Sequence, residues 1–365
     1  IEFINRKAEI TIAIDIASGV DAQNGNIANV AINADYTITM AAMKYGHILY
    51  PGRENSGQVY IVDIGISPET YQQFLPNAEI IEDIKNYIYP RKSNTTKNDF
   101  GRISIIAGSR GLTGAAIMSS KSALEMGSGL IKLIHPKSLS DIFENSLLEV
   151  MSMGVEETED ISISIKSLDS ILSFVENSDA LAIGPGISRN TDTAKFVRKF
   201  LIKNNKPAVI DADALNSFKD HQKDLLKLSG KPYVLTPHLK EFSRISGTST
   251  HDISQQKIKH ALQFAKQLDL VLLLKGSTSI ITDGERITFT TKGNSGLSTG
   301  GSGDVLTGII CSLLGQGYNT YDAARLGSFI LGNTADVVAE MYGEHSTTPQ
   351  KIINNLFKTI SSRQK

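Results

Sequence analysis

A glycine-rich stretch that leads into an apolar helical pattern is the part of this sequence best suited to chemistry. Residues 293–308 have the sequence GNSGLSTGGSGDVLTG. Glycines let another group approach the backbone closely, and the unpaired N–H groups at a helix start suit an anion such as phosphate. Asp304 lies at the mouth of this predicted anion site, where repulsion disfavours a carboxylate unless it accepts a proton from an incoming hydroxyl. The stretch predicts phosphoryl transfer with Asp304 as the base; the alternative is a surface loop whose Asp304 is favourable in a first helical turn.

Further glycine and polar residues follow short apolar runs, the positions at which ligands bind in open α/β sheets. Glycines occur in residues 108–114 and again in 184–186, where plain tight turns are the alternative. Lys275 ends the strongest apolar run and is followed by residues 276–279, Gly-Ser-Thr-Ser. A cation beside a glycine turn predicts a grip on nucleotide phosphate, whereas the alternative is an edge lysine whose ammonium reaches water.

Two other groups of candidates contain carboxylates or histidine. Asp211 and Asp213 end an apolar run and suit a magnesium ion that keeps its waters, while a helix cap at Asp213 is the alternative. His238 and Glu241 follow another such run, and a lone histidine is more often a structural group than a catalyst. The residues alone leave both alternatives open at both places.

The elements that must position these candidates alternate along residues 99–365. Residues 279–290 predict a hairpin that turns at Asp283-Gly284, and 322–342 and 349–361 predict two helices that close the fold. Short continuous apolar strands that alternate with helices indicate a mainly parallel sheet covered on both faces. The predicted strands are 102–107, 130–134, 180–183, 208–211, 233–236 and 270–274, and a helix is expected at 113–126.

The composition is that of an ordinary soluble globular protein. A length of 365 residues allows one large and one small domain, and 41% apolar with 21% charged residues is typical of globular chains. The net charge of -1 predicts no nucleic-acid or membrane surface, and no apolar run reaches the length of a membrane span. The single cysteine, Cys311, excludes an internal disulfide and fits a reducing cytoplasm, so a cytoplasmic location is expected.

The first hundred residues predict a smaller α/β part and a connection. Strands are expected at 11–15, 36–40 and 58–63. Residues 71–98 have the composition of a linker, with Pro76, Pro90 and a polar run, and a short helix is expected near 80–87. The predicted domains are therefore 1–70 and 99–365, joined by this linker.

The residues from Asn294 through Thr307 closely resemble the catalytic signature of the ribokinase-like superfamily. Within that group they look like the version of the NAD(P)H-hydrate dehydratases, which restore damaged NADH and NADPH, although Ser295, Leu297 and Ser298 replace the common proline, methionine and alanine. The resemblance implies a ribokinase-like fold for residues 99–365. It also implies ADP-dependent dehydration of the S form of NAD(P)H hydrate, with Mg²⁺ and with AMP and phosphate as products.

The same resemblance implies individual site residues. The loop after His238 departs from the family, since Leu239-Lys240 stands where proline-glycine is usual, and Ser279 replaces a threonine but keeps its hydroxyl. Substrate contacts are implied for Ala115, Gly186, His238 and Asp304, and nucleotide contacts for Lys275, Gly276, Ser277, Thr278, Ser279 and Gly303.

Residues 1–70 are similar to the second half of NAD(P)H-hydrate epimerases. The resemblance is carried by residues 15–19, 43–46, 50–53 and 62–65, with Ala17 in place of the usual proline. It implies that Asp15 binds substrate and that Ser18 helps to ligate K⁺. Half an α/β layer leaves strand edges and one face uncovered, so we do not expect this part alone to epimerise a substrate. Such a fused order resembles that of bifunctional repair enzymes in bacteria.

Two other functions stay open, because a fold alone does not determine a reaction. The first is a ribokinase-like kinase of a small vitamin alcohol, which the epimerase-like part disfavours. The second is a nucleotide-binding protein without turnover, which the intact Lys275 and Asp304 disfavour. The expected partners are NAD(P)H hydrate and an adenine nucleotide, and a homo-oligomer is expected.

Overall fold

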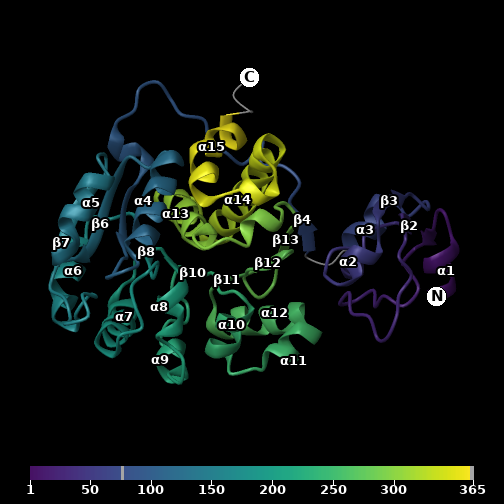
Figure 1. Ribbon diagram of the computed structural model, residues 1–365, viewed down its shortest axis with the longest axis horizontal. Helices are drawn as coiled ribbons and strands as arrows, with labels where there is room; N and C mark the ends of the chain where they lie inside the picture. The colour runs from purple at the N-terminus through teal and green to yellow at the C-terminus, as the bar shows by residue number, and fades with distance from the viewer. Residues whose placement is uncertain (75–77, 362–365) are drawn as a thin grey trace. The chain divides into compact units, whose positions relative to one another are not determined.

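The computed structural model describes residues 1–74 and 78–361, which form two compact units (Figure 1). The smaller unit comprises Ile1–Glu79 with Thr250–His260, and the larger Ile80–Ser249 with Ala261–Lys365. Pro76 of the predicted linker and residues 362–365 of the predicted C-terminal domain lie outside the described residues. Among the helices that are described, none combines the length and apolar character that crossing a bilayer requires.

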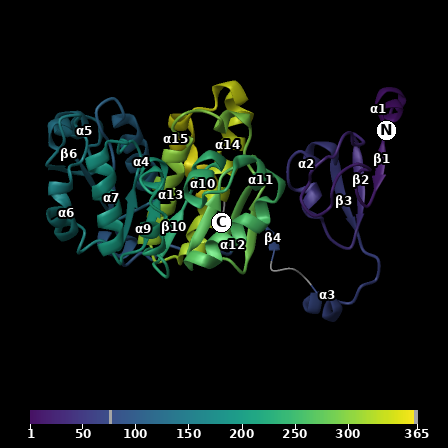
Figure 2. The same ribbon diagram turned by 90° about the horizontal axis from the view of Figure 1, so that it is seen from below.

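In the smaller unit, the described residues contain one sheet of three parallel strands (Figure 2). These are β1 (Ile12–Ile14), β2 (Tyr36–Met40) and β3 (Gln58–Val62), which confirms the three strands predicted there. Alternating side chains of β1 point to opposite faces, so that Ala13 is buried while Ile12 and Ile14 are exposed. The helices of this unit are α1 (Glu2–Lys7), α2 (Gly52–Asn55), α3 (Pro68–Phe74) and α11 (Thr250–Gln255).

Within residues 78–361, ten strands form one sheet in the order β4-β13-β12-β11-β10-β9-β8-β5-β6-β7. From β7 across to β11 every neighbouring pair is parallel, while β12 is antiparallel to both β11 and β13. The strands are β4 (Ala78–Ile80), β5 (Arg102–Ile106), β6 (Leu130–Pro136), β7 (Met151–Val155), β8 (Ala180–Ile183), β9 (Ala208–Ile210), β10 (Tyr233–Leu235), β11 (Val271–Leu274), β12 (Ser279–Thr282) and β13 (Ile287–Thr290).

The predicted hairpin is confirmed as β12 and β13, whose register pairs Ser279 with Thr290. Its turn contains Gly284 at φ +94°, a conformation that glycine adopts without strain. The edge strand β7 was not predicted, because its sequence MSMGV lacks the continuous apolar run of the central strands. Those central strands are buried along their whole length, as the mainly parallel sheet requires.

Part of the predicted linker belongs to the large sheet. β4 lies beside β13, and the Ile81 N–H donates to the Phe289 carbonyl. Ile81 and Ile84 are buried in the main hydrophobic core. The helix expected near 80–87 is therefore wrong: so short a helix gains little by itself, whereas β4 satisfies the free edge of β13 and the chain after it buries Ile81 and Ile84.

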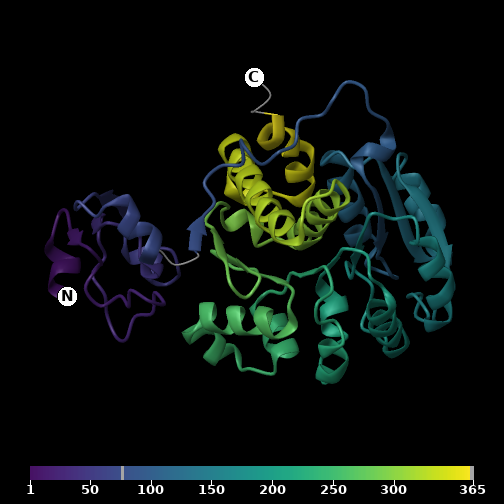
Figure 3. The same cartoon turned by 180° about the vertical axis from the view of Figure 1, so that it is seen from behind.

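Helices cover both faces of this sheet (Figures 1 and 3). α13 packs against α4 and α14, and α14 packs against α15, while α7 to α10 lie across the sheet from them. The mainly parallel sheet with helices on both faces that the sequence predicts is confirmed. The helices of the larger unit are α4 (Thr113–Glu125), α5 (Ser140–Ser146), α6 (Leu168–Phe174), α7 (Thr191–Lys203), α8 (Ala212–Asn216), α9 (Gln222–Leu226), α10 (Leu239–Ser246), α12 (Lys257–Leu268, from Ala261 onward), α13 (Ser302–Gly315), α14 (Thr320–Tyr342) and α15 (Pro349–Ser361).

Candidate active site

The candidate residues of the larger unit gather at the carboxyl ends of five adjacent parallel strands. Ala115, Gly186, Asp211, His238 and Lys275 follow β5, β8, β9, β10 and β11 in turn, and these strands are neighbours in the sheet. The carboxyl ends of parallel strands meet at one edge, which is where open α/β sheets bind ligands. Residues up to 160 positions apart in sequence therefore line one region.

The glycine-rich stretch opens α13 as the sequence predicts. Gly301 is the residue before the helix and has φ +104°, and a Cβ placed on it would lie 2.6 Å from the side-chain Cε of Met118. The positive φ therefore favours glycine at this position, and any larger residue would also displace the end of the Met118 side chain. Asp304 lies in the first helical turn, near the end that carries the positive pole of the helix dipole.

Asp304 is half-buried, and its surroundings raise its pKa to about 7. Burial is the largest cause, because it penalises the charged form, and the nearby carboxylate of Asp211 adds repulsion. Lys275 opposes the shift, and Asp213 contributes a further, smaller rise. A carboxyl group with this pKa can accept a proton and release it at neutral pH.

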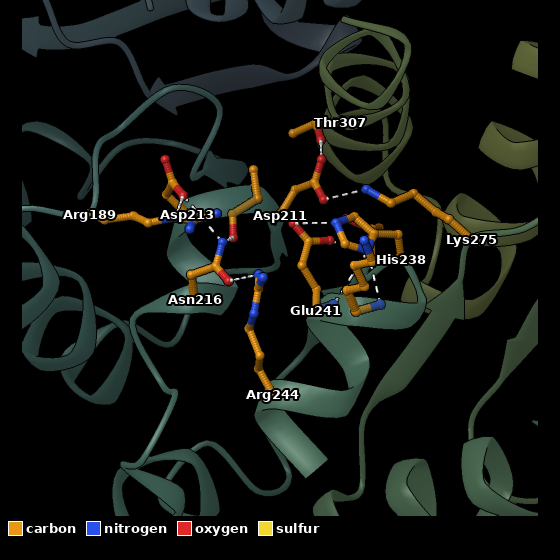
Figure 4. Close-up of polar contacts among 12 residues, drawn as sticks. Arg189, Asp211, Asp213, Asn216, His238, Glu241, Arg244, Lys275 and Thr307 are labelled. Carbon is orange, nitrogen blue, oxygen red and sulfur yellow. Dashed lines mark hydrogen bonds and ion pairs between the residues drawn. The ribbon is translucent and has the colours of Figure 1, made fainter. Parts of the chain in front are cut away.

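Lys275 joins the ends of β11 and β9 through an ion pair with a buried carboxylate (Figure 4). Its Nζ donates to Oδ1 of Asp211 at 2.8 Å, and Asp211 Oδ2 accepts a hydrogen bond from the hydroxyl of Thr307 in α13 at 2.9 Å. Burial alone would lower the pKa of Lys275, but the carboxylates of Asp211, Glu241 and Asp304 outweigh it and raise that pKa. The ammonium is therefore charged and directed into the site.

The backbone at Gly303 passes close to this ion pair. A Cβ placed on Gly303 would lie 3.4 Å from Lys275 Nζ and 3.5 Å from Asp211 Oδ2. In the loop after Lys275, Gly276 and Ser277 are exposed, Thr278 is buried, and Ser279 begins β12. The predicted nucleotide-binding residues Gly303 and Lys275 are thus neighbours, with residues 276–279 continuing directly from the lysine.

Ala115 and Gly186 come together from the loops after β5 and β8. Gly186 has φ +60°, and a Cβ on it would lie 2.6 Å from the Leu112 carbonyl oxygen and 3.1 Å from the Ala115 Cβ. The hydroxyl of Ser109 donates to the Gly186 carbonyl at 2.8 Å, which ties the two loops together. The structure thus places two of the predicted substrate-binding residues side by side, on backbone that a larger side chain would displace.

His238 has a structural role as the N-cap of α10. Its Nδ1 accepts hydrogen bonds from the N–H groups of Lys240 and Glu241, while the Glu241 carboxylate accepts from the His238 N–H at 2.9 Å. This reciprocal arrangement is a capping box. Burial, together with the cations Lys275 and Arg244, lowers the pKa of His238. The neutral ring then carries its proton on Nε2, which lies 3.5 Å from a Glu241 oxygen.

Asp213 is not the helix cap that the sequence suggested as one alternative, and its contact with a hydrated magnesium ion stays a prediction. α8 begins at Ala212, so Asp213 lies inside the helix, and its Oδ1 accepts from Arg189 Nε at 2.8 Å and from Asn216 at 3.2 Å (Figure 4). Both oxygens of Asp211 are also engaged, and the described residues contain no group of three or more acidic, histidine or cysteine side chains arranged for a metal ion. The Asp211–Asp213 pair therefore does not fit a protein-built metal centre.

Asp15 and Ser18 belong to the smaller unit. Asp15 has φ +66°, and its Oδ1 accepts hydrogen bonds from Lys44, from the Thr39 hydroxyl and from the Met40 N–H. The hydrogen bond from Lys44 is the largest cause that lowers the pKa of Asp15. Ser18 is exposed, and its carbonyl accepts the Ile32 N–H at 2.9 Å. The roles predicted for Asp15 and Ser18 stay predictions.

Sequence reasoning missed three residues that the structure brings into the site, namely Arg189, Arg244 and Thr307, and it had named Glu241 only as a neighbour of His238. Glu241 is buried beside His238, Arg189 and Arg244 reach Asp213 and Asn216, and Thr307 binds Asp211. Glu241 carries a local signal, since an acidic residue three positions after a capping residue marks a capping box. The three missed residues depend on contacts between segments 24 to 96 positions apart, which no local pattern carries.

Comparison with known proteins shows which family the chain resembles. The family model described as NAD(P)H-hydrate dehydratase matches residues 103–358, and one described as YjeF-related protein N-terminus matches residues 1–46. The chain is 35% identical over 350 residues to the bifunctional NAD(P)H-hydrate repair enzyme Nnr of Moorella thermoacetica, covering 95% of this chain and 66% of that protein. With the enzyme of the same name from Thermofilum pendens it shares 33% identity, covering 99% and 68%. The chain thus spans about two thirds of the length of these relatives.

Solved structures show the same fold. A ribokinase-like protein of Enterococcus faecalis superposes with a TM-score of 0.69 at 24% identity, covering 80% of this chain and 99% of that one. The ADP/ATP-dependent NAD(P)H-hydrate dehydratase of Bacillus subtilis, co-crystallised with ATP and Mg²⁺, gives a TM-score of 0.64 at 21% identity, covering 77% and 96%. Since the dehydratase family model matches residues 103–358, more than half of the chain and every strand end that forms the site, the chain belongs to the NAD(P)H-hydrate dehydratase family.

Proposed function

We propose that this protein catalyses the ADP-dependent dehydration of the S form of NAD(P)H hydrate, giving NADH or NADPH, AMP and phosphate. The observation that carries the proposal is Asp304: a carboxyl group with a pKa of about 7, at the start of a glycine-opened helix, with the Lys275 ammonium close by. A base, amide donors and a cation are the parts that phosphoryl transfer to an alcohol requires.

The chemistry follows from the leaving group. The hydrate carries a hydroxyl on the ring carbon beside the nicotinamide nitrogen, and hydroxide leaves poorly whereas phosphate leaves well. Asp304 accepts the proton of that hydroxyl. The hydroxyl oxygen attacks the terminal phosphorus of ADP, and the bond between that phosphorus and AMP breaks. The nitrogen lone pair then expels phosphate, and loss of a proton from the adjacent ring carbon restores the double bond.

The remaining residues bind and orient the two ligands. Lys275, residues 276–279 and Gly303 are proposed to hold the nucleotide, because charge spreads over the transferring phosphoryl group and fixed donors stabilise it. Ala115, Gly186 and His238 are proposed to contact the hydrated nicotinamide nucleotide. Magnesium, when bound, neutralises phosphate charge; the nucleotide phosphates and water suit it better here than the engaged carboxylates of Asp211 and Asp213.

The smaller unit is proposed to be the epimerase-like part of a bifunctional repair protein, with Asp15 as a substrate ligand and Ser18 as a K⁺ ligand. The match of residues 1–46 to the YjeF-related N-terminus supports this proposal. Ile12 and Ile14 are 54% and 64% exposed, so one face of β1 is uncovered. We therefore expect epimerase activity of this part to be incomplete.

One assay tests the main proposal. Hydrated NADH is incubated with the protein, ADP and Mg²⁺, and the absorbance of reduced nicotinamide is followed. Absorbance that returns only with ADP and yields AMP and phosphate supports the dehydratase. A stable phosphorylated alcohol would instead indicate a kinase, and tight nucleotide binding without any product would indicate a binding protein.

A further inference from the structure

Asp211 takes no part in the proposed chemistry, yet its carboxylate connects two elements of the site. Its side chain is 2% exposed and its two oxygens have different partners: Oδ1 accepts from Lys275 Nζ and Oδ2 from the Thr307 hydroxyl, at 2.8 and 2.9 Å (Figure 4). Lys275 follows β11 and Thr307 lies in α13. One carboxylate thus links the end of a strand to the helix that carries Asp304.

A purely local role does not explain this side chain. Asp211 is the residue that precedes α8, the position where aspartate often caps a helix, but its carboxylate makes no capping hydrogen bond there. It is turned instead toward α13, and Ala212 adopts φ +51°, a left-handed conformation that a residue with a side chain seldom adopts. This unusual conformation of Ala212 directly follows Asp211, whose side chain binds Lys275 and Thr307.

We propose that Asp211 is a positioning residue of the dehydratase site, which fixes the Lys275 ammonium beside Gly303 and supplies the negative charge that faces Asp304. The inference rests on the proposed function. A lysine has four rotatable bonds and a compact charge, so without a partner its ammonium has no fixed place. Paired with Asp211, it is held where a Cβ on Gly303 would lie 3.4 Å from it. A nucleotide phosphate that binds there meets an ordered cation.

The charges around Asp304 come from several elements. Asp211 and Asp213 approach from the β9 end, Lys275 from the β11 end, and Glu241 and His238 from α10 lie near Lys275. Burial is the largest cause that raises the pKa of Asp304. Among the charged neighbours, Asp211 raises that pKa most and Lys275 lowers it. Without the negative charge of Asp211, the Lys275 ammonium would stabilise ionised Asp304 more strongly, and the pKa of Asp304 would fall. Asp211 therefore keeps the base able to exchange its proton near neutral pH.

Asp211→Asn tests this with little change of shape, because an amide oxygen can still accept from Lys275 while the amide N–H donates to Thr307. The variant should shift the acidic limb of the kcat/KM pH profile downward by about half a pH unit or more. It should also weaken ADP binding, measured by calorimetry, by roughly 5- to 10-fold, since a charged partner orders the lysine. Asp169→Asn is the matched control: this exposed aspartate pairs with Lys203 at 3.5 Å, outside the site, and should change neither quantity.

Thr307 provides a second, independent variant. Thr307→Val keeps the shape but removes the hydroxyl that orients Asp211, so it should weaken ADP binding by about 2- to 5-fold. The acidic limb of the pH profile should not move, because the Asp211 charge stays. Thr307→Ser keeps a hydroxyl and should bind ADP as the wild type does. Wild-type ADP affinity together with an unchanged limb in Asp211→Asn overturns the proposal. If Asp211→Asn does not fold, equal affinities of the valine and serine variants overturn it. Calorimetry needs no turnover, so a wild type that binds ADP but leaves the hydrate unchanged refutes the proposed function separately.

Discussion

The two units each contain an aspartate proposed to contact substrate, and their surroundings shift its pKa in opposite directions. Hydrogen bonding from Lys44 lowers the pKa of Asp15, whereas burial raises that of Asp304 to about 7. A carboxyl group that exchanges its proton at neutral pH can act as a base, while one that stays ionised serves as a fixed charge or hydrogen-bond acceptor. The same side chain is thus suited to chemistry in the larger unit and to binding in the smaller one.

The difference follows from how completely each sheet is covered. Helices lie on both faces of the ten-stranded sheet described in the larger unit, and its central strands are buried throughout. In the three-stranded sheet, Ile12 and Ile14 are exposed and the Asp15 side chain is 37% exposed. Water screens a partly exposed carboxylate, so an ion pair dominates there, whereas desolvation dominates beneath a closed layer.

Asp304→Asn should give the largest effect. Loss of a positioned base lowers kcat by about 10²- to 10⁴-fold, while ADP still binds and the circular dichroism spectrum is unchanged. In the wild type, kcat/KM should rise with pH and level off above about pH 7, because only the ionised carboxylate accepts a proton. A kcat of the variant within about threefold of the wild-type value would show that Asp304 is not the base, and its proposed role would then no longer differ from that of Asp15.

Gly186→Ala should have the next largest effect. The new Cβ would lie 2.6 Å from the Leu112 carbonyl oxygen at a φ of +60°, so the loop beside Ala115 must move. We expect KM for the hydrate to rise by about 10-fold or more and KM for ADP to change little. Gly317→Ala is the control for backbone strain alone, since Gly317 has φ +91° with open space around it. Equal KM values in both variants would show that Gly186 does not shape the substrate pocket.

Much of the fold was predictable because the central strands carry their own signal. The continuous apolar runs of β5, β8 and β11 mark strands buried on both faces, and their alternation with helices fixes the parallel arrangement. The edges were harder: β7 has a mixed sequence, and β4 was mistaken for helix within a linker. An edge strand forms because a neighbouring strand offers unpaired backbone groups, and that neighbour is distant in sequence.

The site was predictable where one segment carries the whole signal. The glycine turn, the helix start and Asp304 are contiguous, and the structure confirms how they are arranged. The place of each candidate at a strand end also followed from the sequence. What the sequence did not contain is the pairing of Asp211 with Lys275 and Thr307, 64 and 96 positions away, because it arises only when the sheet assembles. Those pairings decide which carboxylates remain free for a ligand.

Replacing Asp304 should raise the stability of the fold although it lowers activity. The raised pKa means that the native state binds more protons than the unfolded chain between about pH 4 and 7, so Asp304 makes the fold less stable as pH rises through that range. Asp304→Asn should therefore increase the free energy of unfolding by on the order of 1–2 kcal/mol at pH 8 and by less at pH 5. Urea unfolding at both pH values measures this. An equal gain at the two values would mean that burial does not set the pKa.

The smallest effect is expected in the smaller unit. Lys44→Met keeps the apolar stem but removes the ammonium that binds Asp15, and because this pair is partly exposed, the loss should be no more than about 1 kcal/mol. A lowered native pKa makes the Asp15 contribution present above the unfolded pKa and lost as pH falls through the native one. Faster hydrogen exchange of residues 36–40 in the variant should thus be seen at pH 7 and should disappear in strong acid, whereas Lys7→Met, at an exposed lysine, should match the wild type at both. A difference that persists in acid would mean that Lys44 acts through packing, and the contrast between an ion-paired and a desolvated aspartate would then hold only for Asp304.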